Sequence, residues 1–137
     1  MKAAVWYGQK DVRVEDREPK VLKDNEVKVK VSWTGICGTD LHEYLEGPVF
    51  ISTEQPDPLL GQTAPVTLGH EFSGVVEEVG KDVTKYKKGD RVVVNPTVSR
   101  HEKEENIDLY DGYSFIGLGS DGGFAEFTNA PEENVYA

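Results

Sequence analysis

Val27-Lys28-Val29-Lys30-Val31-Ser32-Trp33-Thr34 is the clearest strand in the sequence, and the fold depends on it. Apolar and polar residues alternate along this stretch. Because successive side chains of a strand point to opposite faces, the pattern puts the valines and Trp33 on one face. We expect that face to belong to the core. The strand leads directly into Gly35-Ile36-Cys37-Gly38, which contains the only cysteine of the chain.

Shorter stretches on both sides have the same character, and turn residues separate them. The strands that we expect cover residues 3–7 and 12–15, joined as a hairpin, and then 72–79, 91–94 and 124–129. Only one helix is expected: Thr39 or Asp40 would cap it, and it would end at Glu46 before Gly47. Short strands with Gly and Pro turns predict a mainly β fold, a small, partly open β-barrel with few short helices.

Two segments have no regular period. The first runs from Pro48 to Pro65 and contains four prolines. A loop of this length is usually a lid, a pocket wall or disordered. Its apolar stretches, Val49-Phe50-Ile51 and Leu59-Leu60, favour a packed pocket wall. The second segment, from Ser99 to Asp111, is polar and charged, so we expect a surface excursion in which His101 is solvated and binds no cation.

The composition argues against several classes of function. The chain has 137 residues, of which 25 are acidic and 15 basic, and its net charge of −10 disfavours binding to nucleic acid phosphates. No apolar run approaches the roughly twenty residues of a membrane span, and the start of the chain lacks the apolar core of a signal peptide. A single cysteine cannot form an internal disulfide. These features predict one soluble, acidic, cytoplasmic domain.

A second glycine-bracketed stretch, Gly69-His70-Glu71-Phe72-Ser73-Gly74, supplies a histidine and a carboxylate. Together with Cys37 they are three residue types that bind zinc. Adjacent strand residues point to opposite faces, so His70 and Glu71 can both face one metal only if the backbone bends there. Otherwise Glu71 lies behind the ligands or reaches the metal intermittently. The alternative is that Cys37 is a small buried apolar residue and that no metal binds.

Gly117-Leu118-Gly119-Ser120-Asp121-Gly122 matches the spacing G-x-G-x-x-G of dinucleotide-binding loops. In those loops the glycines connect a strand to a helix, and the N-terminus of the helix receives the pyrophosphate. Here the residues that follow, Phe124 to Asn129, have the pattern of a strand. The motif therefore lacks its structural context, and we expect these glycines to form a flexible turn rather than a nucleotide site.

Three motifs occur in order along the chain: Gly35-Ile36-Cys37-Gly38-Thr39-Asp40-Leu41-His42; Gly69-His70-Glu71 with Gly74, Gly80 and Val83; and Gly89-Asp90-Arg91-Val92. In this combination the chain resembles, from Met1 to its end, the N-terminal catalytic domain of the zinc-dependent medium-chain alcohol dehydrogenase superfamily. His42-Glu43-Tyr44-Leu45 and the loop Pro48–Pro65 are most similar to the 2,3-butanediol and polyol dehydrogenases. The resemblance implies a GroES-like domain over residues 1–137.

The resemblance also implies a function. The full-length protein would be an NAD(P)-dependent alcohol or diol dehydrogenase that oxidises a secondary alcohol to a ketone through a zinc-bound alkoxide and hydride transfer. Cys37, His70 and Glu71 would hold one catalytic zinc. NAD(P) would bind to a Rossmann domain after Ala137, so no cofactor-binding residue is assigned and this chain alone is expected to be inactive. Residues 100–105 lack the cysteines of the family's structural zinc site, so no structural zinc is expected.

Further roles follow from the same resemblance. Thr39 would take the substrate proton, and His42 would pass it to solvent, since an ordinary histidine pKa lies near neutrality. Asp40 would accept the second ring N–H of His70 and so fix its tautomer. Thr39 and Asp40 could instead be simple helix caps, and His42 a surface histidine. Tyr44 would help to shape the substrate pocket, and the full-length protein is expected to be a homo-oligomer.

Two other interpretations remain open at this point. A stand-alone GroES-like binding or assembly module without catalysis would explain the barrel, but not the joint presence of Cys37, Thr39, His42 and His70. The zinc-free quinone reductases of the same superfamily generally lack this cysteine and the His-Glu pair. The sequence therefore favours a dehydrogenase acting on a small alcohol or diol.

Overall fold

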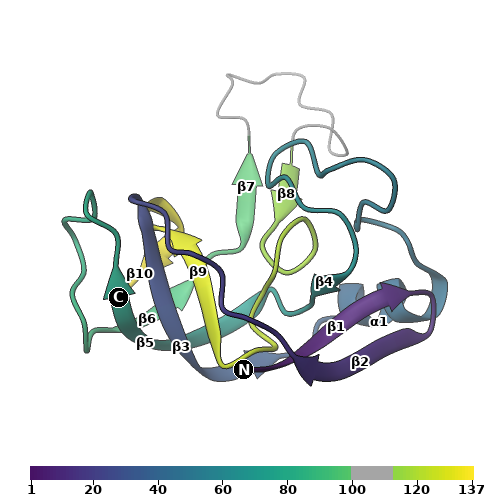
Figure 1. Ribbon diagram of the computed structural model, residues 1–137, viewed down its shortest axis with the longest axis horizontal. Coiled ribbons are helices and arrows are strands. Elements are labelled where there is room, and N and C mark those ends of the chain that lie inside the picture. Colours follow the sequence, from purple (N-terminus) through teal and green to yellow (C-terminus); the bar gives the residue numbers. More distant parts are fainter. Residues whose placement is uncertain (100–112) are drawn as a thin grey trace.

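The structure, a computed structural model, describes residues 1–99 and 113–137 (Figure 1). Its largest sheet has the strand order β10-β6-β5-β3-β9, formed by β10 (Val135–Tyr136), β6 (Arg91–Val94), β5 (Glu71–Val79), β3 (Glu26–Gly35) and β9 (Phe127–Pro131). A second sheet contains β2 (Asp11–Asp16), β1 (Lys2–Gly8) and β4 (Val66–Thr67), and a third pairs β7 (Thr97–Ser99) with β8 (Tyr113–Phe115). The described residues also include α1 (Gly38–Glu46) and a 3-10 helix, η1 (Glu132–Asn134).

The large sheet is antiparallel and curls into a half-barrel around the main core (Figure 1). Apolar side chains of the large sheet and of the segment after β8 meet inside the curve: Val27, Val29, Phe72, Val76, Val92, Val94, Ile116, Ala130 and Val135. Burial of these side chains stabilises the sheet because apolar surface leaves water, at about 25 cal/mol per Å². The prediction of a mainly β, partly open barrel with few short helices is confirmed.

Strand β3 keeps the apolar alternation of its sequence only in part. Val27 and Val29 are fully buried, as predicted, whereas Trp33 is 79% exposed. The reason is a bulge: Val31 pairs with Gly74 and Trp33 with Ser73, so β3 advances two residues while β5 advances one. A bulge shifts the following side chains to the other face of the sheet. The prediction that Trp33 faces the core is therefore wrong.

Helix α1 is held against the small sheet (Figure 1). The indole N–H of Trp6, in β1, donates to the carbonyl of Glu43 at 3.0 Å, and the backbone N–H of Lys10 donates to the carbonyl of Tyr44. The second core lies beside this contact, with the buried side chains Trp6, Ile51, Val66, Leu68 and Leu118. The small sheet thereby fixes the helix whose first turn follows Cys37.

The loop Pro48–Pro65 packs against α1, in agreement with the packed interpretation. The carboxylate of Glu43 is fully buried and accepts the backbone N–H groups of Val49, Phe50 and Ile51. Three N–H donors around one carboxylate compensate the loss of water, which would otherwise make a buried charge costly. This role of Glu43 was not predicted from the sequence.

Several element boundaries differ from the prediction. Cys37, and not Thr39 or Asp40, is the N-cap of α1. The late strand β9 begins at Phe127 rather than Phe124, and the short elements β4, β7, β8, β10 and η1 were not predicted. Ser99 belongs to β7, while the rest of the predicted polar excursion, with His101, lies outside the described residues. Elements of two or three residues carry too little periodicity to be seen in a sequence.

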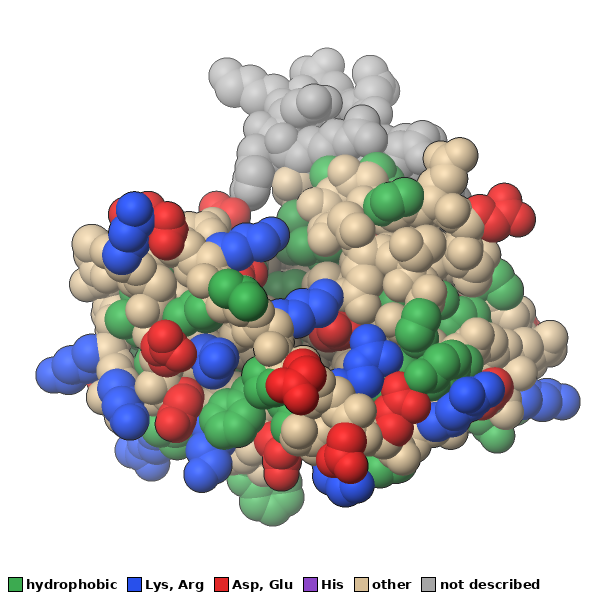
Figure 2. All heavy atoms as spheres, in the orientation of Figure 1, with side chains coloured by type: hydrophobic (Ala, Val, Ile, Leu, Met, Phe, Trp, Pro, Cys, Tyr) green, Lys and Arg blue, Asp and Glu red, His purple; other side chains and the backbone are tan. Residues whose placement is uncertain are grey.

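Acidic and basic side chains are interspersed over the face shown in Figure 2. On that face the excess of acidic residues therefore does not gather into one patch. Among the described residues, none of the helices has the length and apolar character that a membrane crossing requires.

Candidate metal centre

The ladder between β3 and β5 ends beside the candidate ligands. Its last pair joins Gly35 to Glu71. Cys37 follows two residues after Gly35 at the start of α1, and His70 immediately precedes Glu71. The antiparallel register of two long strands thus brings together two stretches that are far apart in the sequence.

The structure places Cys37, His70 and Glu71 in one cluster. One ligand atom from each lies within 4.8 Å of the other two. A thiolate sulfur, an imidazole nitrogen and a carboxylate oxygen are zinc donors, which bind at about 2.0–2.3 Å from the metal. Three atoms with the observed separations can surround one ion and leave a fourth position open. The donor set therefore fits a zinc ion.

A bend at Gly69 lets His70 and Glu71 share this cluster. Gly69 has a φ of +104°, in the left-handed region that side chains disfavour. Strand β5 begins only at Glu71, so His70 lies outside the strand and the alternation of strand faces does not separate the pair. The bend that the sequence analysis required for a shared metal is present.

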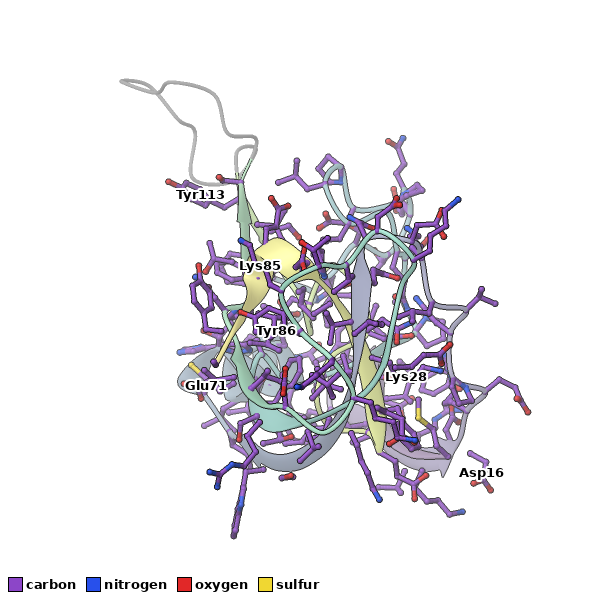
Figure 3. All side chains as sticks on the ribbon, turned by 90° about the vertical axis from the view of Figure 1, so that its left-hand side faces the viewer. Asp16, Lys28, Glu71, Lys85, Tyr86 and Tyr113 are labelled. Atoms are coloured by element: carbon purple, nitrogen blue, oxygen red, sulfur yellow. The ribbon has the colours of Figure 1, made fainter. Side chains whose placement is uncertain are left out.

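A cavity of about 640 Å³ opens at the cluster. His70 is buried, Cys37 is half-buried and Glu71 is exposed; in Figure 3, Glu71 stands at the edge of the molecule. The other residues that line the cavity are largely apolar: Trp33, Gly35, Phe72, Ser73, Val93, Val94, Pro96, Thr97 and Phe115. The metal position would thus be reached from solvent through an apolar mouth.

Asp40 lies behind His70. Its Oδ1 is 3.4 Å from Nδ1 of His70, and both atoms are buried without an aligned hydrogen-bond partner among the described residues. The contact is long for a hydrogen bond, so we treat it as a charge contact. The interaction with Asp40, and to a smaller extent that with Cys37, raises the pKa of His70 to about 9, although burial opposes this increase. With Nδ1 directed to Asp40, the other ring nitrogen is left for a metal.

The thiol of Cys37 has a lowered pKa. The largest cause is the backbone N–H of Thr39, and the His70 ring and the Thr39 hydroxyl add to it. Sγ of Cys37 lies 3.8 Å from Oγ1 of Thr39. The first turn of α1 therefore stabilises the thiolate, which is the form of cysteine that binds metals.

The structure brings most, but not all, of the predicted site residues together. Thr39 adjoins Cys37, and Asp40 adjoins both Cys37 and His70. His42 is exposed on the next turn of α1, and no described contact joins it to the cluster, so its role as a proton relay stays a prediction. Tyr44 is also exposed and does not line the cavity.

Sequence reasoning missed Phe115 as part of this site. Its ring lies 6.5 Å from the ring of His70 and 5.9 Å from that of Phe50, measured between centroids. Phe50 belongs to the loop Pro48–Pro65, so the loop supports the cavity through Phe115 rather than lining it. In the sequence, the only sign of this contact was the apolar character of the stretch Val49-Phe50-Ile51. Phe115 itself gave no sign, because it lies in a strand of only three residues.

A second cavity, of about 340 Å³, lies between the connection that follows β2 and the strand β9. Its described lining contains neither cysteine nor histidine. This cavity is therefore a poor candidate for the metal site. The cysteine and histidine that could bind a metal lie in the cluster around His70.

Comparison with known proteins shows the family of the chain. A family model described as alcohol dehydrogenase GroES-like domain matches residues 23–137. The chain is 51% identical over 137 residues to the (R,R)-butanediol dehydrogenase of Bacillus subtilis. The aligned region covers 99% of this chain and 40% of that protein. The chain thus spans about two fifths of the length of this relative.

Solved structures of alcohol dehydrogenases also match the chain. The crystal structure of 2R,3R-butanediol dehydrogenase from Bacillus subtilis matches with a TM-score of 0.91 at 50% identity, covering 98% of this chain and 39% of that one. A cobalt- and zinc-bound thermostable alcohol dehydrogenase from Pyrobaculum aerophilum matches with a TM-score of 0.79 at 26% identity, covering 100% of this chain and 41% of that one.

Proposed function

The chain belongs to the alcohol dehydrogenase GroES-like domain family, and from that membership we propose that it is the zinc-binding catalytic domain of a longer NAD(P)-dependent alcohol or diol dehydrogenase. The observation that carries the proposal is the cluster of Cys37, His70 and Glu71, whose ligand atoms lie within 4.8 Å of one another at the mouth of a cavity. The identity to a butanediol dehydrogenase supports a vicinal diol or another small secondary alcohol as the substrate.

Oxidation of an alcohol needs removal of the hydroxyl proton before a hydride can leave the carbon. A zinc ion, when bound, acts as a Lewis acid and lowers the pKa of the hydroxyl group in its open position. Cys37 contributes negative charge to the site, and Asp40 orients the ring of His70. Glu71, the exposed member, is the ligand that can move away when substrate enters.

The substrate proton leaves through the first turns of α1. The hydroxyl of Thr39 adjoins the sulfur of Cys37 and is placed to take the proton. His42 follows three residues later on the same helix, a spacing that puts two side chains on one face. Its exposed ring can release the proton to solvent. NAD(P)⁺, when bound by the cofactor domain of the longer protein, would accept the hydride, and the alcohol carbon would become a ketone.

The proposal includes one zinc ion only, because Cys37 is the single cysteine of the sequence and a four-cysteine structural site cannot form from this chain. The longer protein is proposed to be a homo-oligomer. It is also proposed to be cytoplasmic, because a free thiol stays reduced there. Membership of the dehydrogenase family disfavours the alternative of a stand-alone binding module without catalysis.

The activity is tested in the longer protein that contains this chain. Wild-type protein supplied with zinc and NAD⁺ or NADP⁺ should oxidise (R,R)-2,3-butanediol, and the absorbance of the reduced nicotinamide measures the rate. Cys37→Ser should abolish both bound zinc and turnover while the protein stays folded. A wild-type protein that binds zinc but oxidises neither diols nor simple secondary alcohols would refute the proposed reaction.

A further inference from the structure

The glycine-rich segment 117–123 does more than turn the chain. It packs against the backbone that carries His70: the N–H of Gly123 donates to the carbonyl of Gly69 at 2.8 Å, and the N–H of Phe124 donates to the carbonyl of Leu68 at 2.9 Å. The motif that resembled a nucleotide loop therefore contacts the candidate metal centre instead.

The contact is too close for any side chain. A Cβ atom on Gly122 would lie 2.1 Å from the carbonyl oxygen of Gly69, and one on Gly117 would lie 2.3 Å from the same atom. A Cβ atom on Gly123 would lie 2.5 Å from the ring of Phe72. The glycines thus touch the residue before His70 and the residue after Glu71, on both sides of the ligand pair.

The same segment also reaches the strand that carries Cys37. The hydroxyl of Thr34 donates to the carbonyl of Gly123 at 2.6 Å. Thr34 lies near the end of β3, three residues before Cys37. Gly123 is therefore bonded through its N–H to the segment of His70 and through its carbonyl to the segment of Cys37.

These bonds matter because the β3–β5 ladder reaches only one of the three candidate ligands, Glu71. Its last pair is Gly35 and Glu71, so Cys37 and His70 both lie beyond it. A three-ligand site loses affinity when its donors move apart, and partners behind the ligands typically contribute 10- to 100-fold to metal affinity. Contacts outside the ladder therefore help to fix the positions of Cys37 and His70.

We propose that Gly123, bonded to Gly69 and to Thr34, is a positioning element of the metal centre that sets the separation between Cys37 and the pair His70 and Glu71. This inference rests on the proposed zinc site. The glycine-rich segment acts through the ligands and touches neither metal nor substrate.

Thr34→Val tests the bond, and the chain offers a matched control. Thr128, on β9, donates its hydroxyl to the carbonyl of Gly122 at the same distance, 2.6 Å, and β9 carries no candidate ligand. Thr34→Val and Thr128→Val each remove one hydroxyl bond to the glycine-rich segment, so both should lower the melting temperature. Only Thr34→Val removes the link to the segment of Cys37.

The readouts are zinc affinity, from competition with a chelator, and the absorption spectrum of the Co²⁺-substituted chain. Thr34→Val should raise the zinc Kd about 10- to 100-fold and change the Co²⁺ spectrum. Thr34→Ser, which keeps the hydroxyl, should restore both values, and Thr128→Val should retain the wild-type values. If Thr34→Val does not fold, Thr34→Ala is measured in its place.

Two negative results have different meanings. Equal zinc affinities for Thr34→Val and Thr128→Val would overturn the positioning role while leaving the zinc centre intact. A wild-type chain that binds no more zinc than its Cys37→Ser variant would overturn the proposed zinc centre, and the positioning role with it.

Discussion

Asp40 contacts both segments of the candidate metal centre: its Oδ1 is 3.4 Å from Nδ1 of His70, and its Oδ2 accepts the backbone N–H of Cys37 at 3.0 Å. The sequence offered two roles for this residue, a helix cap and a partner of the histidine. Asp40 is not the N-cap itself, but its carboxylate accepts the N–H of the N-cap residue Cys37 and also contacts the ring of His70. A single side chain therefore links the start of α1 to the ring that would hold the metal.

The contact with His70 predicts a pH-dependent effect of Asp40→Asn on the metal-free chain. The pKa of His70 is about 9 in the folded chain against 6.5 as its ordinary value. A raised folded pKa means that the ion pair stabilises the fold fully below pH 6.5 and that this contribution is lost as the pH rises through about 9. Urea unfolding should therefore show a larger stability difference between wild type and Asp40→Asn at low pH than at high pH.

The loss of the bond to the N–H of Cys37 affects Asp40→Asn at every pH and so cancels in this comparison. A stability difference that stays the same from about pH 6 to about pH 10 would show that the 3.4 Å contact carries no charge interaction.

Zinc binding to the metal-free chain should release protons. At neutral pH His70 is protonated, with its pKa near 9, and a metal can bind the ring only after that proton leaves. Calorimetric titration with zinc in two buffers of different ionisation enthalpy counts the protons released, and we expect at least one. Asp40→Asn should release fewer, because Asp40 is the largest cause of the raised pKa of His70. A binding heat independent of the buffer would contradict a protonated His70 that gives up its proton to zinc.

Removal of the buried carboxylate of Glu43 should strongly destabilise the fold. In Glu43→Ala the N–H groups of Val49, Phe50 and Ile51 lose their acceptor inside the protein. An unsatisfied buried donor costs about 1–3 kcal/mol, and the bond from Ile51 is the buried one, so a loss of about 1–3 kcal/mol is expected. Glu46→Ala, at the exposed end of the same helix, is the control and should change stability by less than about 0.5 kcal/mol. Equal effects in urea unfolding would disprove the role of Glu43.

Thr39→Val should reduce turnover in the longer protein without loss of zinc. A positioned proton acceptor typically contributes 10²- to 10⁴-fold to rate, so a decrease of about that size in kcat is expected. His42→Gln should have a smaller effect, since solvent can take the proton from an exposed site. Steady-state kinetics and zinc content are measured on the same samples. Unchanged turnover in Thr39→Val would remove Thr39 from the proton path.

Long periodic stretches of the sequence predicted their strands well. The region 72–79 became β5 and 91–94 became β6, each within a residue of the expected bounds. The prediction that Trp33 faces the core was wrong because a bulge depends on the partner strand, and the sequence of one strand does not contain that information. The cap at Cys37 was missed because cysteine is not a usual N-cap residue.

The candidate ligands could be named from residue type and motif, but their supports could not. Cys37, His70 and Glu71 are chemically recognisable zinc donors. Gly122 and Gly123 contribute only backbone atoms and the absence of a side chain, so nothing in their type indicates what they contact. Phe115 contacts the ring of His70 directly, and through Phe115 the distant Phe50 supports the site. Such long-range packing follows from the fold and is invisible in local pattern.

The central claim is that Cys37, His70 and Glu71 together bind one zinc ion, and X-ray absorption at the zinc edge tests it most directly. The zinc-loaded chain should contain about one zinc, with one sulfur neighbour near 2.3 Å and nitrogen or oxygen neighbours near 2.0–2.2 Å. The Cys37→Ser variant, which should not retain stoichiometric zinc, should give no such spectrum. A wild-type spectrum with no sulfur neighbour, from a folded chain that contains stoichiometric zinc, would contradict the account.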